Sequence, residues 1–286
     1  MEKPTYLTEA AITQFIQSAL REDVGDGDHS SLAAIPAHAE NKARLLVKDS
    51  GILAGVELAQ LIFREVDPSL TMQVFMPDGS TVAQGDVAFT VTGRAQAILT
   101  AERLVLNCMQ RMSGIATYTQ HLTQLIAGTN ARLLDTRKTT PNFRIMEKWA
   151  VVIGGGVNHR FGLFDMIMLK DNHVDYAGGI KQAITATQRY LTQHNKKLPI
   201  VIETRNLSEV QQTLDTGGID RIMLDNMPPH LMREAVELIN GQYETEASGG
   251  ITEETIAAVA ASGVDYISVG ALTHSSKSLD LSLKAF

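Results

Sequence analysis

The chain has 286 residues, of which 44% are hydrophobic and 20% charged, a balance typical of a globular protein and not of a disordered or fibrous one. Its net charge of -7 argues against nucleic acid or an anionic membrane as a main partner, because both favour basic surfaces. The single cysteine, Cys108, excludes an intramolecular disulfide and favours a reducing compartment. The sequence contains no apolar run of about 18 residues, and its first residues lack a secretory signal. We therefore expect a cytoplasmic protein.

The first 112 residues predict a mixed, largely antiparallel domain. A helix is expected after Thr8, whose side chain suits the N-cap position. Alternating apolar runs bounded by turn residues predict three strands, over residues 43–48, 71–76 and 87–92. A long helix is expected over 94–126, and Cys108 lies on its apolar stripe. This position indicates a small buried core residue and not a nucleophile.

From residue 130 the pattern alternates between strands and helices, which predicts a parallel sheet because parallel strands need crossover helices. Six strands are expected, over residues 132–136, 166–170, 200–204, 221–225, 243–248 and 265–270. A doubly wound open sheet and a closed barrel both fit this alternation. Polar residues at the ends of many different strands favour the barrel, whose active sites gather at the carboxyl ends of its strands. An open sheet would concentrate them at one switch point.

Basic and histidine side chains are concentrated between residues 137 and 173 of this otherwise acidic chain. Arginine binds carboxylate or phosphate through two parallel hydrogen bonds, and lysine provides a compact charge. The concentration therefore predicts a cationic pocket for an anionic small molecule, and a solvated basic face is the alternative. Gly154, Gly155 and Gly156 lie within the same stretch.

Two later strands end in glycines. Ser248, Gly249 and Gly250 precede a helix expected near Thr252, and Gly270 closes the last strand. Backbone amides at such turns bind anions, and late loops of a barrel are a common place for a phosphate. The pair of glycine turns thus predicts a phosphate site.

Two carboxylates, Glu203 and Asp225, end consecutive strands. They could act as acid and base, bind sugar hydroxyls, hold Mg²⁺ through waters, or balance the cations in ion pairs. An earlier acidic cluster, Asp23, Asp26 and Asp28 with His29, superficially suggests metal ligands. The glycines between its members indicate a solvated turn instead.

Eight segments resemble the quinolinate phosphoribosyltransferase family in residues and order: 22–28, 101–103, 136–141, 154–160, 170–173, 225–226, 246–251 and 268–274. The resemblance covers essentially the whole chain. It implies an α/β fold, with an N-terminal open sandwich domain over 1–112 and a TIM-like open barrel of about seven strands over 113–274. We expect the tail 275–286 to pack on the first domain. The implied reaction joins quinolinate to phosphoribosyl pyrophosphate (PRPP) with Mg²⁺, giving nicotinate mononucleotide, CO₂ and pyrophosphate in NAD biosynthesis.

The resemblance also implies a role for each matching position. The quinolinate carboxylates are held by Arg137, His159, Arg160 and Lys170. Arg103 enters from the neighbouring subunit of a homodimer, and assembly beyond the dimer stays open. Lys138 faces the pyrophosphate. Glu203 and Asp225 meet the ribose hydroxyls and, through water and bound PRPP, the Mg²⁺ ion. The 5′-phosphate is bound by Ser248, Gly249, Gly250, Gly270 and His274. Thr136 completes the substrate-binding set, and the implied catalytic residues are Lys138, Lys170, Glu203 and Asp225.

The chain departs from the family pattern at Asn142, Phe143, Trp149, Val152 and Val201, where we expect Gly, Leu, Tyr, Arg and an acid. None of these departures removes an expected ligand. Two other functions fit the residues: an aldolase that forms a Schiff base on Lys170, and a barrel that binds a phosphorylated metabolite without turnover. From the residues alone, Arg103 is expected to be a solvated surface residue.

Overall fold

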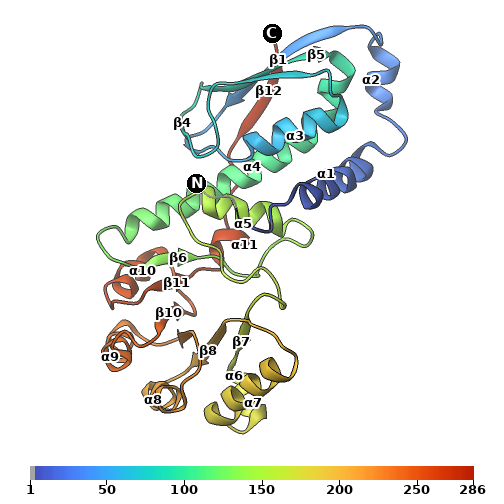
Figure 1. The fold of residues 1–286 in the computed structure, drawn as a ribbon. Coiled ribbons are helices and arrows are strands. Elements are labelled where there is room, and N and C mark those ends of the chain that lie inside the picture. Colours follow the sequence, from blue (N-terminus) through green and yellow to red (C-terminus); the bar gives the residue numbers. More distant parts are fainter. Residues whose placement is uncertain (1–3) are drawn as a thin grey trace. The chain divides into compact units, whose positions relative to one another are not determined.

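The computed structural model describes residues 4–286, which form two compact units (Figure 1). The first contains the described residues up to Gln120 together with Thr139–Gly155 and Leu272–Phe286, and the second contains His121–Lys138 and Gly156–Ala271. Residues 1–3 lie outside the described residues, and they begin the segment that is expected to lack a secretory signal. Within residues 4–286, no helix has the length and apolar character needed to cross a membrane.

The first unit is built on an antiparallel sheet in the strand order β12-β1-β5-β3. Its strands are β1 (Glu40–Val47), β3 (Thr71–Val74), β5 (Val87–Arg94) and β12 (Leu281–Ala285). The three strands predicted in this region are confirmed. The C-terminal tail supplies the fourth: β12 pairs with β1, placing Leu283 opposite Leu45, and Figure 1 shows the two ribbons side by side. A small second sheet joins β2 (Gly51–Ile52) to β4 (Thr81–Val82).

Helices complete the first unit: α1 (Glu9–Val24), α2 (His29–Ala34), α3 (Val56–Val66), α4 (Ala95–Leu125), α5 (Arg144–Ile153) and α11 (Ala271–His274). Thr8 caps α1 as predicted, because its hydroxyl oxygen accepts the N–H of Ala11. Phe63 of α3 meets Phe89 of β5 edge to face, which places the core between helix and sheet. The boundary expected at residue 112 falls inside α4, and α5 lies in the first unit.

Two expectations about single residues are settled in this unit. Cys108 is buried on α4, and its burial raises the pKa of the thiol to about 12, which makes it a core residue and a poor nucleophile. Asp28 is the N-cap of α2 and accepts the backbone N–H of Ser31 at 3.1 Å. One member of the early acidic cluster therefore caps a helix. Within residues 4–286, no group of three or more His, Cys, Asp or Glu side chains could hold a metal ion.

The second unit is a six-stranded parallel sheet in the order β6-β11-β10-β9-β8-β7. Its strands are β6 (Arg132–Leu134), β7 (Ile167–Leu169), β8 (Ile200–Thr204), β9 (Arg221–Asp225), β10 (Glu244–Ser248) and β11 (Tyr266–Ser268). All six predicted strands are present. A parallel bridge from Leu134 to Val157 adds a seventh position beside β6. This arrangement is the predicted TIM-like open barrel.

Crossover helices join these strands: α6 (Asp171–Ala177), α7 (Ile180–Gln193), α8 (Leu207–Thr216), α9 (Pro229–Ile239) and α10 (Glu253–Ala260). The segment Asn206-Leu-Ser-Glu209 has the residues of a capping box at the start of α8, which forms only in half. Asn206 Oδ1 accepts the N–H of Glu209 at 3.0 Å, but the Glu209 carboxylate accepts from Arg205 instead of returning to Asn206.

Candidate active site

Parallel pairing brings the polar strand ends of the second unit to one edge of the sheet, because all six strands run in the same direction. Asp225 at the end of β9 is in register with Ser248 at the end of β10. Glu203 lies near the end of β8, and Lys170 directly follows β7. Residues on four neighbouring chain segments therefore face a common mouth, as the strand pattern predicted.

Lys170 and Glu203 form an ion pair at this mouth. Lys170 Nζ lies 2.5 Å from Glu203 Oε1, and the backbone N–H of Asp171 donates to Glu203 Oε2 at 3.2 Å. The Glu203 side chain is 8% exposed and that of Lys170 is 47% exposed. The carboxylate is thus fixed from two sides, while the lysine amine remains accessible. A Schiff-base lysine usually stands in an apolar pocket, and Lys170 does not.

Asp225 is held by two donors, one at the end of β10 and one in the loop that follows β9. Ser248 Oγ donates to Asp225 Oδ1 and Asn226 Nδ2 donates to Asp225 Oδ2, both at 2.7 Å. Gly249 and Gly250 follow with φ of 90° and 60°, values that glycine adopts without steric cost. The glycine turn packs closely on Asn226, since a Cβ atom at Gly249 would lie 2.5 Å from Asn226 Cγ. The turn therefore exposes backbone next to a carboxylate of fixed orientation.

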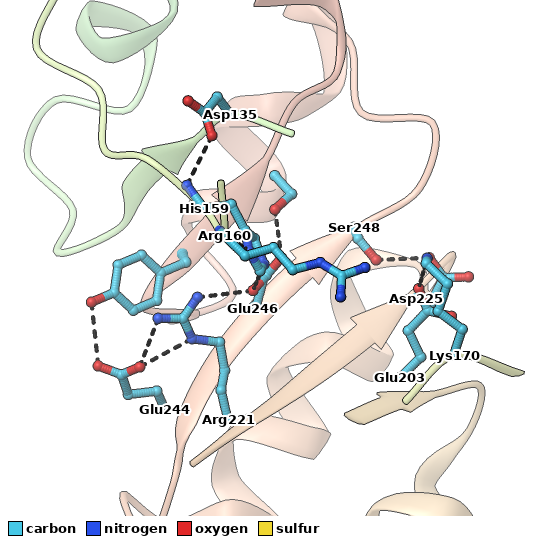
Figure 2. Close-up of polar contacts among 12 residues, drawn as sticks. Asp135, His159, Arg160, Lys170, Glu203, Arg221, Asp225, Glu244, Glu246 and Ser248 are labelled. Atoms are coloured by element: carbon cyan, nitrogen blue, oxygen red, sulfur yellow. Dashed lines mark hydrogen bonds and ion pairs between the residues drawn. The ribbon is translucent and has the colours of Figure 1, made fainter. Parts of the chain in front are cut away.

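Two guanidinium groups at the mouth influence each other. Burial and the positive charge of Arg137 hold the pKa of Arg160 below its usual value, whereas Asp165 and Glu203 act in the opposite direction. Figure 2 shows the Arg160 side chain extending toward Lys170, Asp225 and Ser248. Because like charges repel, an anion bound between the two guanidiniums would lower the free energy of the pair. Planar guanidiniums suit a carboxylate in particular.

His159 precedes Arg160 and is buried, with a side chain that is 4% exposed. Its backbone N–H donates to Asp135 Oδ1 at 2.8 Å, and its ring nitrogen Nε2 lies 3.1 Å from Glu246 Oε2. Its other ring nitrogen, Nδ1, accepts the backbone N–H of Arg160 at 2.7 Å. Both ring nitrogens thus face groups of the protein. The direct contact with quinolinate that the resemblance implies for His159 stays a prediction.

An ion-pair network continues from His159 through the buried Glu246 to Arg221 and the half-exposed Glu244 (Figure 2). Arg221 Nη1 donates to Glu246 Oε2 at 3.0 Å, and its Nε and Nη2 donate to Glu244. The guanidinium also lies 4.0 Å from the ring centroid of Tyr266. Burial acts to raise the pKa of Glu246, but hydrogen bonds from His159 and Ser268 and the charge of Arg221 outweigh it and keep this pKa below its usual value.

Sequence reasoning gave Glu246 and Arg221 no functional role. The sequence did contain a sign that Glu246 is unusual. The run Glu244-Thr-Glu-Ala-Ser248 is polar, whereas a parallel strand covered on both faces is normally apolar. The other missed contact lies in the first unit, where the buried Glu147 accepts two hydrogen bonds from Arg111. Arg111 lies beside the apolar stripe of α4, and its pairing depends on a residue 36 positions away.

The remaining predicted site residues have simpler surroundings. Thr136 Oγ1 accepts the backbone N–H of Lys138 at 3.1 Å, which shapes the turn after β6. Gly270 directly precedes α11. Arg103 and His274 are exposed residues of the first unit. The structure thus groups twelve residues of the prediction in the second unit around the strand ends, and the roles of Arg103 and His274 stay predictions.

Part of the basic stretch has a structural explanation. Arg144 begins α5 and donates to Thr139 Oγ1, and both residues belong to the first unit. The glycine that follows α5 allows close helix packing, since a Cβ atom at Gly154 would lie 2.9 Å from Ala116 Cα. The cationic mouth is therefore formed by fewer residues than the sequence cluster contains.

The carboxylates Glu203 and Asp225 do not form a ready-made metal site, because each already uses both of its oxygens as acceptors. A carboxylate oxygen that accepts one hydrogen bond still has a lone pair for a water molecule, and Mg²⁺ prefers oxygen ligands and retains waters. These residues therefore fit an ion that is held through water and substrate, and not one bound directly by the protein.

Comparisons with known proteins agree with this arrangement. The chain matches the family models "Quinolinate phosphoribosyl transferase, N-terminal domain" over residues 28–113 and "Quinolinate phosphoribosyl transferase, C-terminal domain" over residues 115–284. It is 49% identical to quinolinate phosphoribosyltransferase [decarboxylating] 1 of Nicotiana glauca, across 98% of this chain and 83% of the relative. It is 41% identical to a probable nicotinate-nucleotide pyrophosphorylase [carboxylating] of Synechocystis, across 96% of this chain and 92% of the relative.

Solved structures give the same result. The NadC structure from Streptococcus pyogenes superposes with a TM-score of 0.92 at 38% identity and covers 99% of this chain and 100% of its own. A nicotinate-nucleotide pyrophosphorylase from Francisella tularensis gives a TM-score of 0.92 at 35% identity, with 100% of both chains covered. Since both domains match in order and over nearly the full length, the chain belongs to the quinolinate phosphoribosyltransferase family.

Proposed function

We propose that this protein is an enzyme that transfers the phosphoribosyl group of PRPP to quinolinate with decarboxylation. The products are nicotinate mononucleotide, CO₂ and pyrophosphate, and the step belongs to NAD biosynthesis. The observation that carries this proposal is the arrangement at one barrel mouth of two interacting guanidiniums, Arg137 and Arg160, beside the Lys170–Glu203 ion pair and the glycine turn after Ser248.

The guanidinium pair supplies the site for quinolinate, which carries two carboxylates on adjacent ring carbons. Arg137 and Arg160 repel each other, and a dianion bound between them offsets that repulsion. Lys170 adds a third positive charge that is still half exposed. Binding is therefore favoured for a compact dianion over a monocarboxylate, since the second carboxylate offsets more of the positive charge that these three side chains bring together.

The residues around Asp225 supply the site for PRPP. Exposed backbone at Gly249 and Gly250 suits the approach of the 5′-phosphate. Asp225 and Glu203 are oriented by neighbouring donors so that their remaining lone pairs can accept from ribose hydroxyls. Lys138, exposed after the turn of Thr136, is suited to the pyrophosphate.

Glycosyl transfer with pyrophosphate leaving passes through an oxocarbenium-like state, so the protein contributes mainly positioning and electrostatic stabilisation. The nearby carboxylates favour the positive charge that develops on the ribose, and the cations favour the leaving anion. Formation of the N-glycosidic bond makes the pyridine ring cationic. This charge stabilises the electron pair left on the ring carbon when its bond to the adjacent carboxylate breaks and CO₂ leaves, and a proton from water then takes the place of CO₂. No covalent enzyme intermediate is required.

Mg²⁺ is the cofactor we propose, held by PRPP and by water molecules next to Glu203 and Asp225. When bound, the ion neutralises the charge of the pyrophosphate. Removal of Mg²⁺ with EDTA is expected to abolish turnover, and excess Mg²⁺ is expected to restore it. Calorimetric titration should show Mg²⁺ binding in the presence of PRPP and none without it. Tight binding to the protein alone would contradict the indirect site.

We also propose a homodimer in which Arg103 enters the neighbouring active site, with assembly beyond the dimer left open. The support within this chain is that Arg103 is exposed on α4 while its neighbours Leu104 and Val105 are buried. The cytoplasmic location stays a prediction. Plant relatives carry the designations chloroplastic and mitochondrial, as in the proteins of Oryza sativa and Nicotiana tabacum.

The test is to incubate the purified chain with quinolinate, PRPP and Mg²⁺ and to follow nicotinate mononucleotide and pyrophosphate by chromatography. Equal amounts of both products are expected, together with loss of labelled CO₂ from quinolinate. Nicotinate, which lacks one carboxylate, is the matched control and should react far more slowly. Binding of both substrates without product would leave a barrel that binds a phosphorylated metabolite. Borohydride trapping of an adduct on Lys170 would support an aldolase.

A further inference from the structure

The buried network below the site has one contact that reaches the substrate-binding residues. Glu246 is fully buried in the middle of β10, and its Oε2 accepts from both His159 Nε2 and Arg221 Nη1. Its second oxygen, Oε1, accepts from Ser268 Oγ. Three donors from three different segments therefore converge on the Glu246 carboxylate. Among these donors, His159 is the one that directly precedes Arg160 at the mouth.

The contacts of His159 specify where its ring carries a proton. Arg160 N–H can only donate, so His159 Nδ1 must be the unprotonated nitrogen that accepts it. The single proton of the neutral ring then belongs on Nε2, where Glu246 accepts it. A carboxylate on one nitrogen and a backbone N–H on the other thus select a single tautomer and a single ring orientation.

This orientation of the His159 ring fixes the backbone N–H of Arg160, which donates to Nδ1. Asp135 holds the preceding peptide, since its two oxygens accept the N–H of His159 and the side-chain amide of Asn158. The chain at 158–160 is therefore fixed by side chains of β10 and of the turn after β6, and not by regular secondary structure. The position of the Arg160 guanidinium depends on these contacts and on its own hydrogen bond, in which Nη1 donates to the backbone oxygen of Met166 at 3.3 Å.

We propose that Glu246 is a positioning residue for quinolinate binding, which fixes the Nε2-protonated tautomer of His159 and through it the placement of Arg160. Arg221 makes this possible because its charge stabilises a carboxylate that is completely removed from water. Glu244 and the ring of Tyr266 in turn hold Arg221 in place. The inference rests on the proposed function in one respect: Arg160 is the residue that binds a quinolinate carboxylate.

The first experiment tests the tautomer without reference to activity. The wild-type protein, labelled with ¹⁵N in its 8 histidines, is examined by long-range ¹H–¹⁵N correlation NMR at neutral pH. The signals of His159 are those missing from the His159→Gln variant. We expect a ring with protonated Nε2 and unprotonated Nδ1. An Nδ1-protonated or doubly protonated ring would overturn the proposal.

The second experiment compares two uncharged replacements of Glu246. Glu246→Gln can place its carbonyl oxygen at the Oε2 position, where it accepts from His159 and Arg221, while its amide faces Ser268. Glu246→Met has a similar length and no oxygen acceptor. Both variants remove the charge next to Arg221, but only Glu246→Met also removes the oxygen that accepts from His159 and Arg221.

For Glu246→Met we expect the KM for quinolinate to rise by about 10- to 100-fold, the range that small displacements of binding groups produce. The KM for PRPP should change by less than about threefold, because Glu246 does not contact the residues around Asp225. Glu246→Gln should retain most of the affinity for quinolinate and the His159 tautomer. Glu244→Gln removes a partner of Arg221 without contacting His159, and should leave the KM for quinolinate unchanged.

The outcomes separate the inference from the proposed function. Equal KM values for quinolinate in the Gln and Met variants of Glu246 would overturn the positioning role, as would parallel increases for both substrates. If Glu246→Met does not fold, the tautomer in wild type and in Glu246→Gln still decides the question. A wild-type protein that forms no nicotinate mononucleotide would refute the proposed function, while the NMR result would stand.

Discussion

The glycine turn after β10 offers a sharp comparison, because two adjacent glycines share a left-handed backbone and differ in their surroundings. Gly250 has a φ of 60° and no atom within 4 Å of a Cβ placed on it. Gly249 has a φ of 90°, and a Cβ there would lie 2.5 Å from Asn226 Cγ and 3.0 Å from Asn226 N. Gly250→Ala therefore introduces backbone strain alone, whereas Gly249→Ala must also displace Asn226.

The expected magnitudes follow from these contacts. Left-handed strain costs about 1–2 kcal/mol for an alanine. Displacing Asn226 also weakens its hydrogen bond to the Asp225 carboxylate, which is worth about 1.5–3 kcal/mol. Gly249→Ala should thus cost about 2.5–5 kcal/mol in the free energy of unfolding. At roughly 2–4 °C per kcal/mol, its Tm should lie about 3–12 °C below that of Gly250→Ala.

Thermal unfolding and steady-state kinetics provide the assays. Gly249→Ala should raise the KM for PRPP more than the KM for quinolinate, because Asp225 and the turn lie at the proposed PRPP site. In an Asn226→Gly background, Gly249→Ala should cost clearly less, since the clashing side chain is gone and only the left-handed strain and the close contact with the backbone N of residue 226 remain. Equal destabilisation by the two alanine substitutions, or additive effects in the double variant, would refute the reasoning.

Three further expectations concern other parts of the molecule. Arg160→Ala should weaken quinolinate binding by about 2–5 kcal/mol and leave PRPP binding nearly unchanged; unchanged quinolinate affinity in direct titration would remove Arg160 from the carboxylate site. Inactive Arg103→Ala and Lys170→Ala chains, refolded together in equal amounts, should regain about a quarter of wild-type activity, because about half of the dimers then hold one intact site; no recovery would place Arg103 in its own subunit's site. The N–H of Ser69 and the guanidinium of Arg94 lower the pKa of Asp67 to about 2. Its stabilisation should be complete above the ordinary carboxyl pKa of about 4 and disappear as the pH falls toward 2. Urea denaturation of Asp67→Asn and wild type should therefore differ at pH 7 and converge near pH 2.

The departure from the family pattern at Asn142 has a physical explanation in the structure. Its φ is 62°, in the left-handed region where we expected glycine. Asparagine is among the few other residues that tolerate this conformation. The substitution therefore keeps the backbone of the turn before α5, and the adjacent Phe143 ring packs against Phe15 at 5.5 Å between centroids. No structural consequence of the departure at Val152 is apparent.

Local sequence patterns by themselves determined the strands of the barrel and the residues at its mouth. Strand length, polar termini and glycine turns are properties of short segments, and parallel direction follows from the crossover helices between them. Lys170, Glu203, Asp225 and Ser248 could be placed at one edge for that reason alone. The family resemblance then depended on the same short segments, taken in order.

Only the tertiary structure decided which distant segments meet. Nothing in the sequence of β12 specifies β1 as its partner, because the pairing depends on the edge that β1 leaves available, more than 230 residues earlier. The tautomer of His159 likewise depends on Glu246, 87 positions away and unremarkable in any local pattern except as a charge within a strand. Burial makes such contacts specific, since a buried charge must find its donors wherever the fold brings them. The sequence therefore determined the reacting side chains, and the packing of the barrel determined how they are held.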